Sequence, residues 1–426
     1  MLDLRRIREN PEAVLAALRT KNPALTLDEV LSLDARRLEL LREGETLKAT
    51  RNTQSKAIGD LQKAGQDASA AMAATRELGE RIKALDAELK DVDERQTDLL
   101  MRLPNTPHPD TPLGRDERDN VEIARWGTKP DFAFTPKDHL ALGEALDILD
   151  FPRGAKIAGS GFPVYKGLGA RLERALINFM LDLQTLEHGY REVFPPFLAN
   201  RESMTATGQL PKMEEDMYHA GKDDLFAIPT AEVPITNLHR DEVLAGEDLP
   251  VRYAGYSACF RREAGSYGRD VRGFLRVHQF NKVELVQFTR PEDSDAALEA
   301  LRGHAEEVLR RLGLHYRVLA LCTGDLSFAS ARTYDLEVWS PAEGKFLECS
   351  SCSTFTDFQA RRGSMRFKDK GGKPQFLHTL NGSGLATSRL IVALLETYQQ
   401  ADGSIRVPEA LKPHLGGLEV IGAEAR

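Results

Sequence analysis

Apolar residues recur in alternating steps of four and three along two stretches near the start of the chain, which is the heptad period of a coiled coil. The first stretch runs from Leu33 to Leu61 and is interrupted by polar residues and glycine, whereas the second, from Leu78 to Leu99, is interrupted only at Gln96. A short segment containing Gly65 separates the two. We therefore predict an antiparallel hairpin of two helices, of which the part from Leu33 to Leu61 would be about 40 Å long at about 1.5 Å per residue.

The pattern changes after a proline-rich segment. Four prolines lie between residues 104 and 112, where they exclude a helix and favour a stiff connector. Beyond them, residues 140–149 and 168–188 have helical periodicity, and residues 251–260 and 274–288 alternate as strands do. The chain is thus predicted to be an α+β protein that begins with a long helical hairpin.

The composition fits a soluble globular protein of two or three domains, with 426 residues, 41% apolar and 29% charged. The 57 Lys and Arg residues face 65 Asp and Glu residues, and the net charge of −8 argues against holding nucleic acid by bulk charge. On the first helix of the hairpin, however, basic residues outnumber acidic ones, which could support local phosphate contacts. These basic residues are Arg36, Arg37, Arg42, Lys48, Arg51, Lys56 and Lys63. An oligomerisation coiled coil with a solvated charged face is the alternative.

Cysteine usage and the lack of long apolar runs indicate a cytoplasmic protein. The four cysteines, Cys259, Cys322, Cys349 and Cys352, are too few for a disulfide scaffold, so a reducing compartment is predicted. The N-terminal residues do not resemble a signal peptide, and no apolar run reaches the roughly 18 to 20 residues that span a bilayer. Cys349 and Cys352 have the C-x-x-C spacing of zinc half-sites, but two further ligands do not lie nearby in sequence, so zinc is not expected.

The segment around Arg261 is densest in chemically active residues and is predicted to fold as a strand, a Gly-rich loop and a returning strand. Arg261 and Glu263 would share one face of the first strand, and Arg276, Phe280 and Glu284 would share one face of the second. Such a surface offers guanidinium groups for phosphate, a ring for stacking and a carboxylate for an amine. A surface hairpin stabilised by cross-strand ion pairs is the alternative.

This segment resembles motif 2 of the class II aminoacyl-tRNA synthetases and, more narrowly, that of the zinc-free, bacterial-like seryl-tRNA synthetase family. Residues 189–196 resemble motif 1, whose helix and strand form the dimer interface of the family, and residues 381–389 resemble motif 3. Residues 230–234 resemble the loop that contacts serine. The order and spacing of these motifs are highly specific, and the resemblance covers essentially the whole chain.

The resemblance implies a domain organisation and a reaction. Residues 1–103 would form a tRNA-binding coiled-coil arm, residues 104–125 a Pro-rich linker, and residues 126–426 a catalytic domain whose core is an antiparallel β-sheet flanked by helices. The chain would be a homodimer that activates L-serine with ATP to seryl-adenylate and pyrophosphate, then transfers serine to the 3′-terminal adenosine of tRNA(Ser). The family commonly serylates tRNA(Sec) as well, where that tRNA exists. The alternatives are an ATP-dependent ligase that loads a carrier protein, whose known forms lack the long arm, and a non-catalytic RNA-binding paralogue.

For ATP, the resemblance assigns catalytic roles to three arginines. Arg261 would grip the α-phosphate, Arg276 would be a second phosphate contact, and Arg389 would sandwich the adenine ring together with Phe280. Glu263 would accept a hydrogen bond from the adenine amine. The remaining ATP-binding residues are Arg262, Glu348, Cys349, Ser350 and Ser351. Of these, Glu348 and Ser351 would be ligands of Mg²⁺, which prefers oxygen donors.

For serine, the resemblance assigns a pocket in which Glu284 holds the α-ammonium, and Glu232 and Ser383 lie near the hydroxyl. The full set is Thr230, Ala231, Glu232, Arg261, Glu284 and Ser383. A site built to hydrogen-bond a hydroxyl rejects alanine by roughly 10⁴-fold or more, whereas fit alone excludes one extra methyl by only about 10 to 200-fold. Threonine is therefore expected to be a harder competitor than alanine or glycine.

Overall fold

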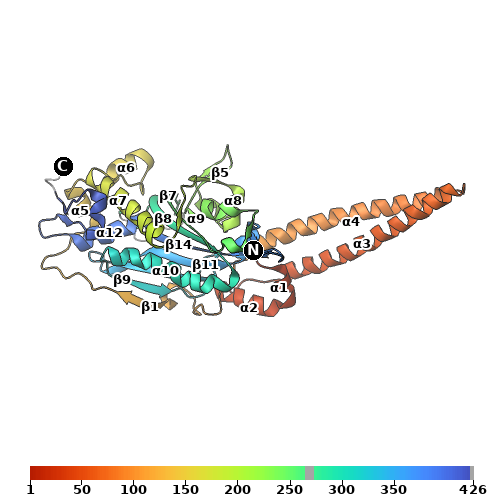
Figure 1. The fold of residues 1–426 in the computed structure, drawn as a ribbon, viewed down its shortest axis with the longest axis horizontal. Helices are drawn as coiled ribbons and strands as arrows, with labels where there is room; N and C mark the ends of the chain where they lie inside the picture. Colours follow the sequence, from red (N-terminus) through yellow and green to blue (C-terminus); the bar gives the residue numbers. More distant parts are fainter. Residues whose placement is uncertain (264–272, 423–426) are drawn as a thin grey trace. The chain divides into compact units, whose positions relative to one another are not determined.

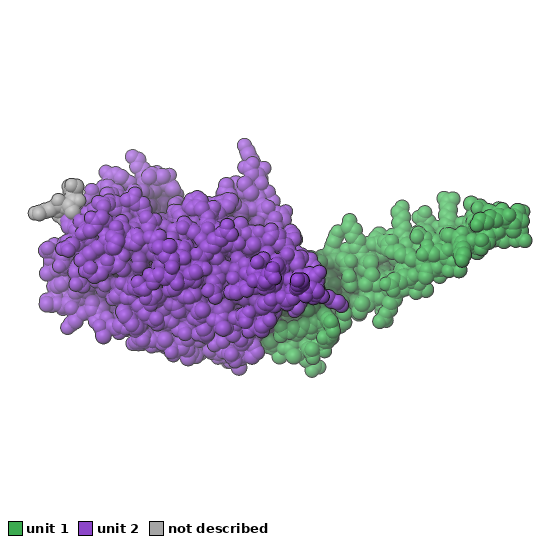
Figure 2. Space-filling model, in the orientation of Figure 1, with its two compact units in different colours: residues 1–104 green, residues 105–426 purple. Residues whose placement is uncertain are grey.

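The computed structural model describes residues 1–263 and 273–422, and the chain divides into two compact units, Met1–Pro104 and Asn105–Arg426 (Figures 1 and 2). The first unit begins with two short helices, α1 (Leu4–Glu9) and α2 (Pro11–Lys21), and continues with two long ones, α3 (Asp28–Lys63) and α4 (Ser69–Arg102). At about 1.5 Å per residue, α3 and α4 are each about 50 Å long. The predicted helical hairpin is confirmed, and both helices begin earlier than their apolar periodicity suggests.

The turn of the hairpin and its seam follow from the sequence. Gly65 takes a positive φ of 67°, a conformation that a side chain would disfavour, and the Gln66 amide donates to the Leu61 carbonyl to close α3. Between the two helices, a small apolar core forms from residues that the heptad places on facing sides. Its buried members are Leu33, Leu40 and Val92, with Leu85, Leu89 and Leu99 packed against them.

Ion pairs join the two helices on either side of this seam. Three of the basic residues on α3 are neutralised by carboxylates of α4: Arg36 by Glu88, Arg37 by Asp93 and Lys48 by Asp86, at 2.7, 2.6 and 2.8 Å. In the opposite direction, Arg81 and Arg95 of α4 pair with Glu43 and Glu29 of α3. Part of the charge on α3 therefore joins the two helices of the hairpin.

The second unit is built on an eight-stranded sheet in the order β1-β9-β10-β11-β14-β8-β7-β2, antiparallel except where β2 joins β7. Its strands are β1 (Val121–Trp126), β2 (Arg191–Glu192), β7 (Val251–Phe260), β8 (Gln279–Thr289), β9 (Tyr316–Ala320), β10 (Arg332–Ser340), β11 (Lys345–Thr356) and β14 (His378–Ala386). The predicted antiparallel α+β core is confirmed.

Helices cover the sheet, and side-chain alternation along β8 separates two cores. Val283 and Leu285 belong to a large core shared with α7 (Leu168–Asp182), α10 (Ser294–Arg311) and α12 (Thr387–Tyr398). Val286 and Phe288 point the other way, into a smaller core with α9 (Glu232–Thr236) and α11 (Phe358–Arg362). Lys282 and Glu284 share the parity of this second set, so β8 carries charged residues on the face toward α9.

Smaller elements complete this unit. The helices are α5 (His139–Ala145), α6 (Phe151–Ala158) and α8 (Arg201–Thr207). One three-stranded sheet consists of β3 (Leu198–Asn200), β4 (His219–Ala220) and β5 (Leu225–Ala227), and another of β6 (Val243–Ala245), β12 (Arg366–Lys368) and β13 (Gln375–Phe376). A two-stranded sheet pairs β15 (Ile405–Arg406) with β16 (Val420–Ile421). Across the described ranges 1–263 and 273–422, no helix is long and apolar enough to cross a membrane.

Several predicted boundaries shift. The helix expected at 140–149 ends at Ala145, because Asp147 takes a positive φ and Leu149 bridges to Tyr165. The helix expected at 168–188 continues beyond Asp182 only as a π-helical turn. The strand at 251–260 has the predicted bounds, but the strand expected from residue 274 begins at Gln279. The apolar residues at 274–278 are buried without forming a strand, which explains the misleading pattern.

The segment predicted as a Pro-rich linker, residues 104–125, belongs to the second unit from Asn105 onward. The Asn105 amide group donates to the carbonyls of Ala329 and Phe355, at 3.0 and 2.8 Å, and is itself buried. Residues 121–126 then pair with β9 as an edge strand. Proline removes backbone donors, but side chains such as Asn105 supply the hydrogen bonds that fix the segment.

Candidate active site

Glu284 lies at the centre of a buried polar pocket on β8. Its side chain is inaccessible to solvent, and each carboxylate oxygen has a partner. Thr230 Oγ1 donates to Oε2 at 2.9 Å, and Asn381 Nδ2 donates to Oε1 at 2.8 Å. Ser383, on the neighbouring strand β14, is the backbone partner of Glu284 and is also buried. The fold therefore brings together Thr230, Glu284 and Ser383 from three separate segments.

Lys282 is a member of this pocket that the sequence did not reveal. Its Nζ pairs with Glu284 Oε2 and donates to Thr230 Oγ1 at 2.8 Å, and the residue is only 5% exposed. The available signal was its position two residues before Glu284, which places both side chains on one face of a strand. Asn381, within the segment that resembles motif 3, was likewise not assigned a role.

Glu232 is a second buried carboxylate at this site. Burial, and next the nearby charge of Glu284, raise the pKa of Glu232 to about 7. Gln359 Nε2 donates to Glu232 Oε1 at 2.6 Å, and Thr379 Oγ1 donates in turn to Gln359 Oε1 at 2.7 Å. Near neutral pH a substantial fraction of this carboxyl therefore carries a proton, and it can donate as well as accept a hydrogen bond. Ala231, beside it, caps α9 and is buried.

Arg261 lies where β7 ends and reaches across the ring of Phe280, with its guanidinium carbon 5.2 Å from the ring centroid. Its Nε donates to the Pro229 carbonyl at 3.4 Å, next to the loop that carries Thr230. The backbone of Arg261 is held twice by His278, at 2.9 Å in both cases. Arg261 thus adjoins both Phe280 and the pocket around Glu284.

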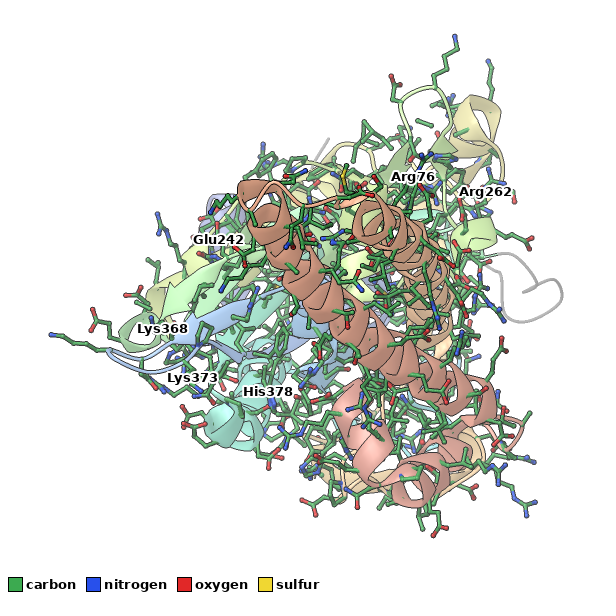
Figure 3. All side chains as sticks on the ribbon, turned by 90° about the vertical axis from the view of Figure 1, so that its right-hand side faces the viewer. Arg76, Glu242, Arg262, Lys368, Lys373 and His378 are labelled. Carbon is green, nitrogen blue, oxygen red and sulfur yellow. The ribbon has the colours of Figure 1, made fainter. Side chains whose placement is uncertain are left out.

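The expected pairing of Arg261 and Glu263 on one strand face is wrong. β7 ends at Phe260, and Glu263 has a positive φ of 51°, which breaks the extended geometry. Glu263 instead forms a 3.0 Å ion pair with Arg276, which itself precedes β8 rather than lying in it. Arg262, labelled in Figure 3, stacks over the Tyr218 ring. The Gly-rich part of the predicted loop, residues 264–272, lies outside the described residues.

A β-bulge at Cys349 brings Glu348 and Ser351 together. Ser350 is opposite Leu336 and Glu348 is opposite Glu337, so Cys349 is the extra residue. Residues three apart in a regular strand face opposite ways, but here Ser351 Oγ lies 3.5 Å from Glu348 Oε1. Ser351 Oγ also donates to Asp335 Oδ1 at 2.5 Å. The result is a cluster of oxygen donors, and burial together with Glu348 raises the pKa of Asp335 well above its usual range.

Arg389 joins this cluster from the first turn of α12. Its Nη1 donates to the Glu348 carbonyl at 2.8 Å and lies 3.4 Å from the Glu348 carboxylate. Its Nε donates to the Leu275 carbonyl at 3.3 Å. Gly382 and Gly384 lie within β14, beside the buried Leu301 and Leu285, and α12 begins only at Thr387.

The cysteines of the C-x-x-C pair are buried free thiols. Burial raises the pKa of Cys352 to about 12 and that of Cys349 further still. Cys349 Sγ donates to the Leu336 carbonyl at 3.3 Å, and Ser350 Oγ donates to the Ser383 carbonyl at 2.7 Å. A protonated thiol is a poor nucleophile and a poor metal ligand. Within the part of the chain that the structure describes, no three His, Cys, Asp or Glu side chains form a metal-binding group.

Comparisons with known proteins cover both units. Residues 1–107 match the family described as seryl-tRNA synthetase N-terminal domain, and residues 213–398 match the tRNA synthetase class II core domain (G, H, P, S and T). The serine–tRNA ligase of Geotalea uraniireducens is 57% identical over 422 residues, which cover 99% of this chain and 100% of the relative. That of Geobacter sulfurreducens is 55% identical over 423 residues, with the same coverage.

Two solved structures extend the similarity to three dimensions. The seryl-tRNA synthetase of Pyrococcus horikoshii, complexed with ATP, superposes with a TM-score of 0.94 at 39% identity and covers 99% of both chains. The cytoplasmic serine–tRNA ligase of Naegleria fowleri, in complex with AMP, superposes with a TM-score of 0.89 at 28% identity, covering 99% of this chain and 98% of the other. Both structures match along nearly the full length, the hairpin included.

Proposed function

The chain belongs to the seryl-tRNA synthetase family, and we propose that it joins L-serine to tRNA(Ser) in two steps at the site on β8. In the first, the serine carboxylate attacks the α-phosphate of ATP, a phosphorus–oxygen bond forms, and pyrophosphate leaves. In the second, a terminal ribose hydroxyl of the tRNA attacks the acyl carbon, and AMP leaves. Neither step needs a nucleophilic side chain, so the enzyme contributes position and charge.

The single observation that carries this proposal is the buried pocket around Glu284. A buried carboxylate beside hydroxyl and amide groups suits a small zwitterion with a hydroxyl of its own. We assign Glu284 to the serine ammonium and Glu232 with Ser383 to the hydroxyl, with Thr230 and Ala231 closing the pocket. Alanine has no hydroxyl to pair with Glu232 and Ser383, so the pocket should reject it strongly.

The residues around Arg261 form the proposed ATP site. Arg261 adjoins the serine pocket, so its guanidinium is placed to bind the α-phosphate where the two substrates meet and to balance the charge that develops there. Phe280 and Arg389 would sandwich adenine, with Glu263 on its amine. Arg276 would contact a second phosphate, and Arg262, Cys349 and Ser350 would complete the site. Glu263 and Arg276 neutralise each other in the free protein.

Glu348 and Ser351 would hold the Mg²⁺ that accompanies ATP. The bulge places their oxygens 3.5 Å apart on one side of β11, and a set of oxygen ligands that leaves room for waters and phosphates is the type that Mg²⁺ prefers. When bound there, the ion would neutralise charge on the phosphates. Asp335, which accepts from Ser351, would orient that hydroxyl.

The helical hairpin is the proposed tRNA-binding element, for tRNA(Ser) and for tRNA(Sec) where it exists. Three basic residues of α3 already form ion pairs with α4, so the remaining cations of α3 are the candidates for phosphate contacts. Arg42, Arg51, Lys56 and Lys63 have no carboxylate partner among the described residues. Three of these four lie in the half of α3 nearest the turn. Between Lys48 and Lys63, four basic residues accompany a single acidic one, Asp60, and this local excess of positive charge can attract phosphate although the whole chain is acidic.

A homodimer is supported by an exposed apolar edge. The last strand of the sheet, β2, has only two residues, and the Phe194 that follows it is 76% exposed, in contact with Phe197 and Tyr256. Leu186, in the π-helical turn before β2, is 81% exposed. Exposed large apolar side chains on segments that flank an edge strand are typical of surfaces that another subunit covers. The free thiols fit a reducing cytoplasm.

Two assays test the proposal on the full chain. Serine-dependent exchange of pyrophosphate into ATP measures the first step, and charging of tRNA(Ser) measures both. We expect exchange with serine and at most weak exchange with threonine, alanine and glycine. Replacing residues 33–99 with a short flexible linker should abolish charging and retain exchange. Activation of threonine at or above the rate of serine would contradict the assignment of the pocket.

A further inference from the structure

Glu173 is a buried carboxyl group that no step of the proposed reaction uses. It lies on α7, is 5% exposed, and points toward the sheet. Its Oε1 accepts a hydrogen bond from Asn281 Nδ2 at 2.7 Å and another from Thr387 Oγ1 at 2.6 Å. Burying a carboxyl group costs free energy unless hydrogen bonds replace those that it made to water. A carboxyl group on a helix whose other buried residues are mainly apolar therefore suggests a specific role.

The two partners of Glu173 belong to the two segments that carry the proposed adenine site. Asn281 directly follows Phe280 on β8, and Thr387 opens α12 two residues before Arg389. Thr387 Oγ1 also lies 3.1 Å from the Asn281 carbonyl, so the two segments meet at this point. Asn281 is held once more from its other side, because Tyr256 OH donates to Asn281 Oδ1 at 3.0 Å.

The surroundings of Glu173 favour its uncharged form. Its second oxygen, Oε2, is buried and has no hydrogen-bond partner among the described residues, and the nearby Tyr165 hydroxyl is also buried. Burial is the main reason that the pKa of Glu173 is raised to about 7, and the hydrogen bonds from Thr387 and Asn281 only partly oppose it. Glutamine has the same shape and no charge, so it should replace this group well.

We propose that Glu173 is a positioning residue for the adenine site, which holds Phe280 and Arg389 at the separation that a purine ring requires. The inference rests on the proposed function, in that Phe280 and Arg389 are taken to bind adenine. A role in stability alone would not require both hydrogen bonds to end on these two segments. No hydrogen bond in the described part of the chain links Glu173 to Thr230, Glu232, Glu284 or Ser383. Its effect should therefore fall on ATP and not on serine.

The test compares ATP binding and kinetics for the full-length protein and four variants. Calorimetric titration with Mg·ATP in the absence of serine measures binding directly, and pyrophosphate exchange gives separate KM values for ATP and serine. Glu173→Ala removes the acceptor that Asn281 and Thr387 share, so we expect about tenfold weaker ATP binding, with the KM for serine within about twofold of wild type. Glu173→Gln should restore ATP binding to within about threefold, since its side-chain oxygen still accepts both hydrogen bonds.

Two further variants complete the design. Thr387→Val removes one of the two donors and should weaken ATP binding about threefold without disturbing the fold. Tyr165→Phe is the matched control, because its hydroxyl makes no hydrogen bond to Glu173 and its loss should change neither KM. Thermal unfolding establishes that each variant is folded. If Glu173→Ala does not fold, the ATP affinities of Thr387→Val and Glu173→Gln test the positioning role.

The outcomes separate this inference from the proposed function. A wild-type protein that does not bind ATP, or binds it without serine-dependent exchange, would overturn the proposed function. A wild-type protein that does both, together with unchanged ATP affinity in Glu173→Ala and Thr387→Val, would overturn the positioning role alone. Equal rises in the KM values for ATP and serine would also overturn it, because they would show a general loss of structure.

Discussion

The charged residues of the helical hairpin and those of the β8 pocket are of the same chemical kinds but lie in opposite environments. Arg37 and Asp93, which pair across the hairpin, have side chains that are 32% and 45% exposed. Lys282 and Glu284, which pair in the pocket, are 7% and 0% exposed. Exposed pairs contribute little to stability because water already solvates both partners. A buried pair contributes by keeping each of its members from being an uncompensated charge.

This difference suits the two binding partners. A tRNA backbone is long and uniformly charged, so exposed cations on a helix face can bind it through its phosphates and release its counter-ions. Serine is small and must be distinguished from alanine and threonine, so its pocket needs groups fixed in position before it arrives. The same kinds of side chain are therefore exposed to water where the proposed ligand is a polyanion and buried where the proposed ligand is a zwitterion.

The sharpest test of the comparison replaces each member of the buried pair Lys282–Glu284 in turn. Replacing Lys282 with Met leaves Glu284 without its cation, and replacing Glu284 with Gln leaves Lys282 without its anion. Each single change should cost about 3–5 kcal/mol of unfolding free energy, because an unpaired charge stays buried. The double variant Lys282→Met/Glu284→Gln should lose clearly less, since no charge is stranded. Denaturant unfolding of the four proteins measures these values.

Activity should not follow stability in this series. Serine-dependent exchange is expected to fail in both proteins that lack Glu284, the double variant included, because the ammonium of serine then has no carboxylate. A double variant that loses as much stability as the two single variants added together would mean that the pair makes no coupled contribution. Full exchange in Glu284→Gln would refute the role given to Glu284.

The next largest effect is expected on catalysis, from replacing Arg261, whose proposed role is to stabilise the charge of the transition state. We expect Arg261→Ala to reduce pyrophosphate exchange by about 10²–10³-fold, the usual cost of losing one group that stabilises developing charge. The fold should be unaffected, because the only side-chain hydrogen bond of Arg261 among the described residues is the long one to Pro229. Arg311→Ala, which breaks exposed pairs with Glu187 and Glu307, is the matched control and should retain exchange. Near wild-type exchange in Arg261→Ala would remove it from the catalytic machinery.

The sequence was more informative about the hairpin than about the pocket, and the reason is physical. A heptad is a local, repeated signal, and it located α3, α4 and their seam. Motif order identified the strands that bring the site together. By contrast, the burial of Lys282, the bulge at Cys349 and the hydrogen bonds of Glu173 depend on contacts between segments more than 50 residues apart or on the register of neighbouring strands. Side-chain spacing along one segment cannot reveal them, and it also misplaced Glu263, whose backbone leaves the strand.

The smallest expected effects come from comparing the α3 cations that have no carboxylate partner with those that pair with α4. Replacing Arg51, Lys56 and Lys63 together with Gln removes cations that have no carboxylate partner in the described structure. We expect the KM for tRNA to rise about tenfold and its salt dependence to flatten, because fewer counter-ions are released on binding. Exchange of pyrophosphate should be unchanged, since it needs no tRNA. Charging assays at two salt concentrations measure both effects.

The matched control replaces Arg36, Arg37 and Lys48 with Gln, which removes the same charge from the same helix. These cations are already neutralised by Glu88, Asp93 and Asp86, so their loss should change the KM for tRNA by about twofold at most. It should instead destabilise the hairpin by about 0.2–1 kcal/mol for each pair. If both triple variants raised the KM equally, net charge alone would govern binding, and the division between paired and unpaired cations would have no functional meaning. A larger effect of the unpaired set would show that the cross-helix ion pairs select which part of α3 the tRNA contacts.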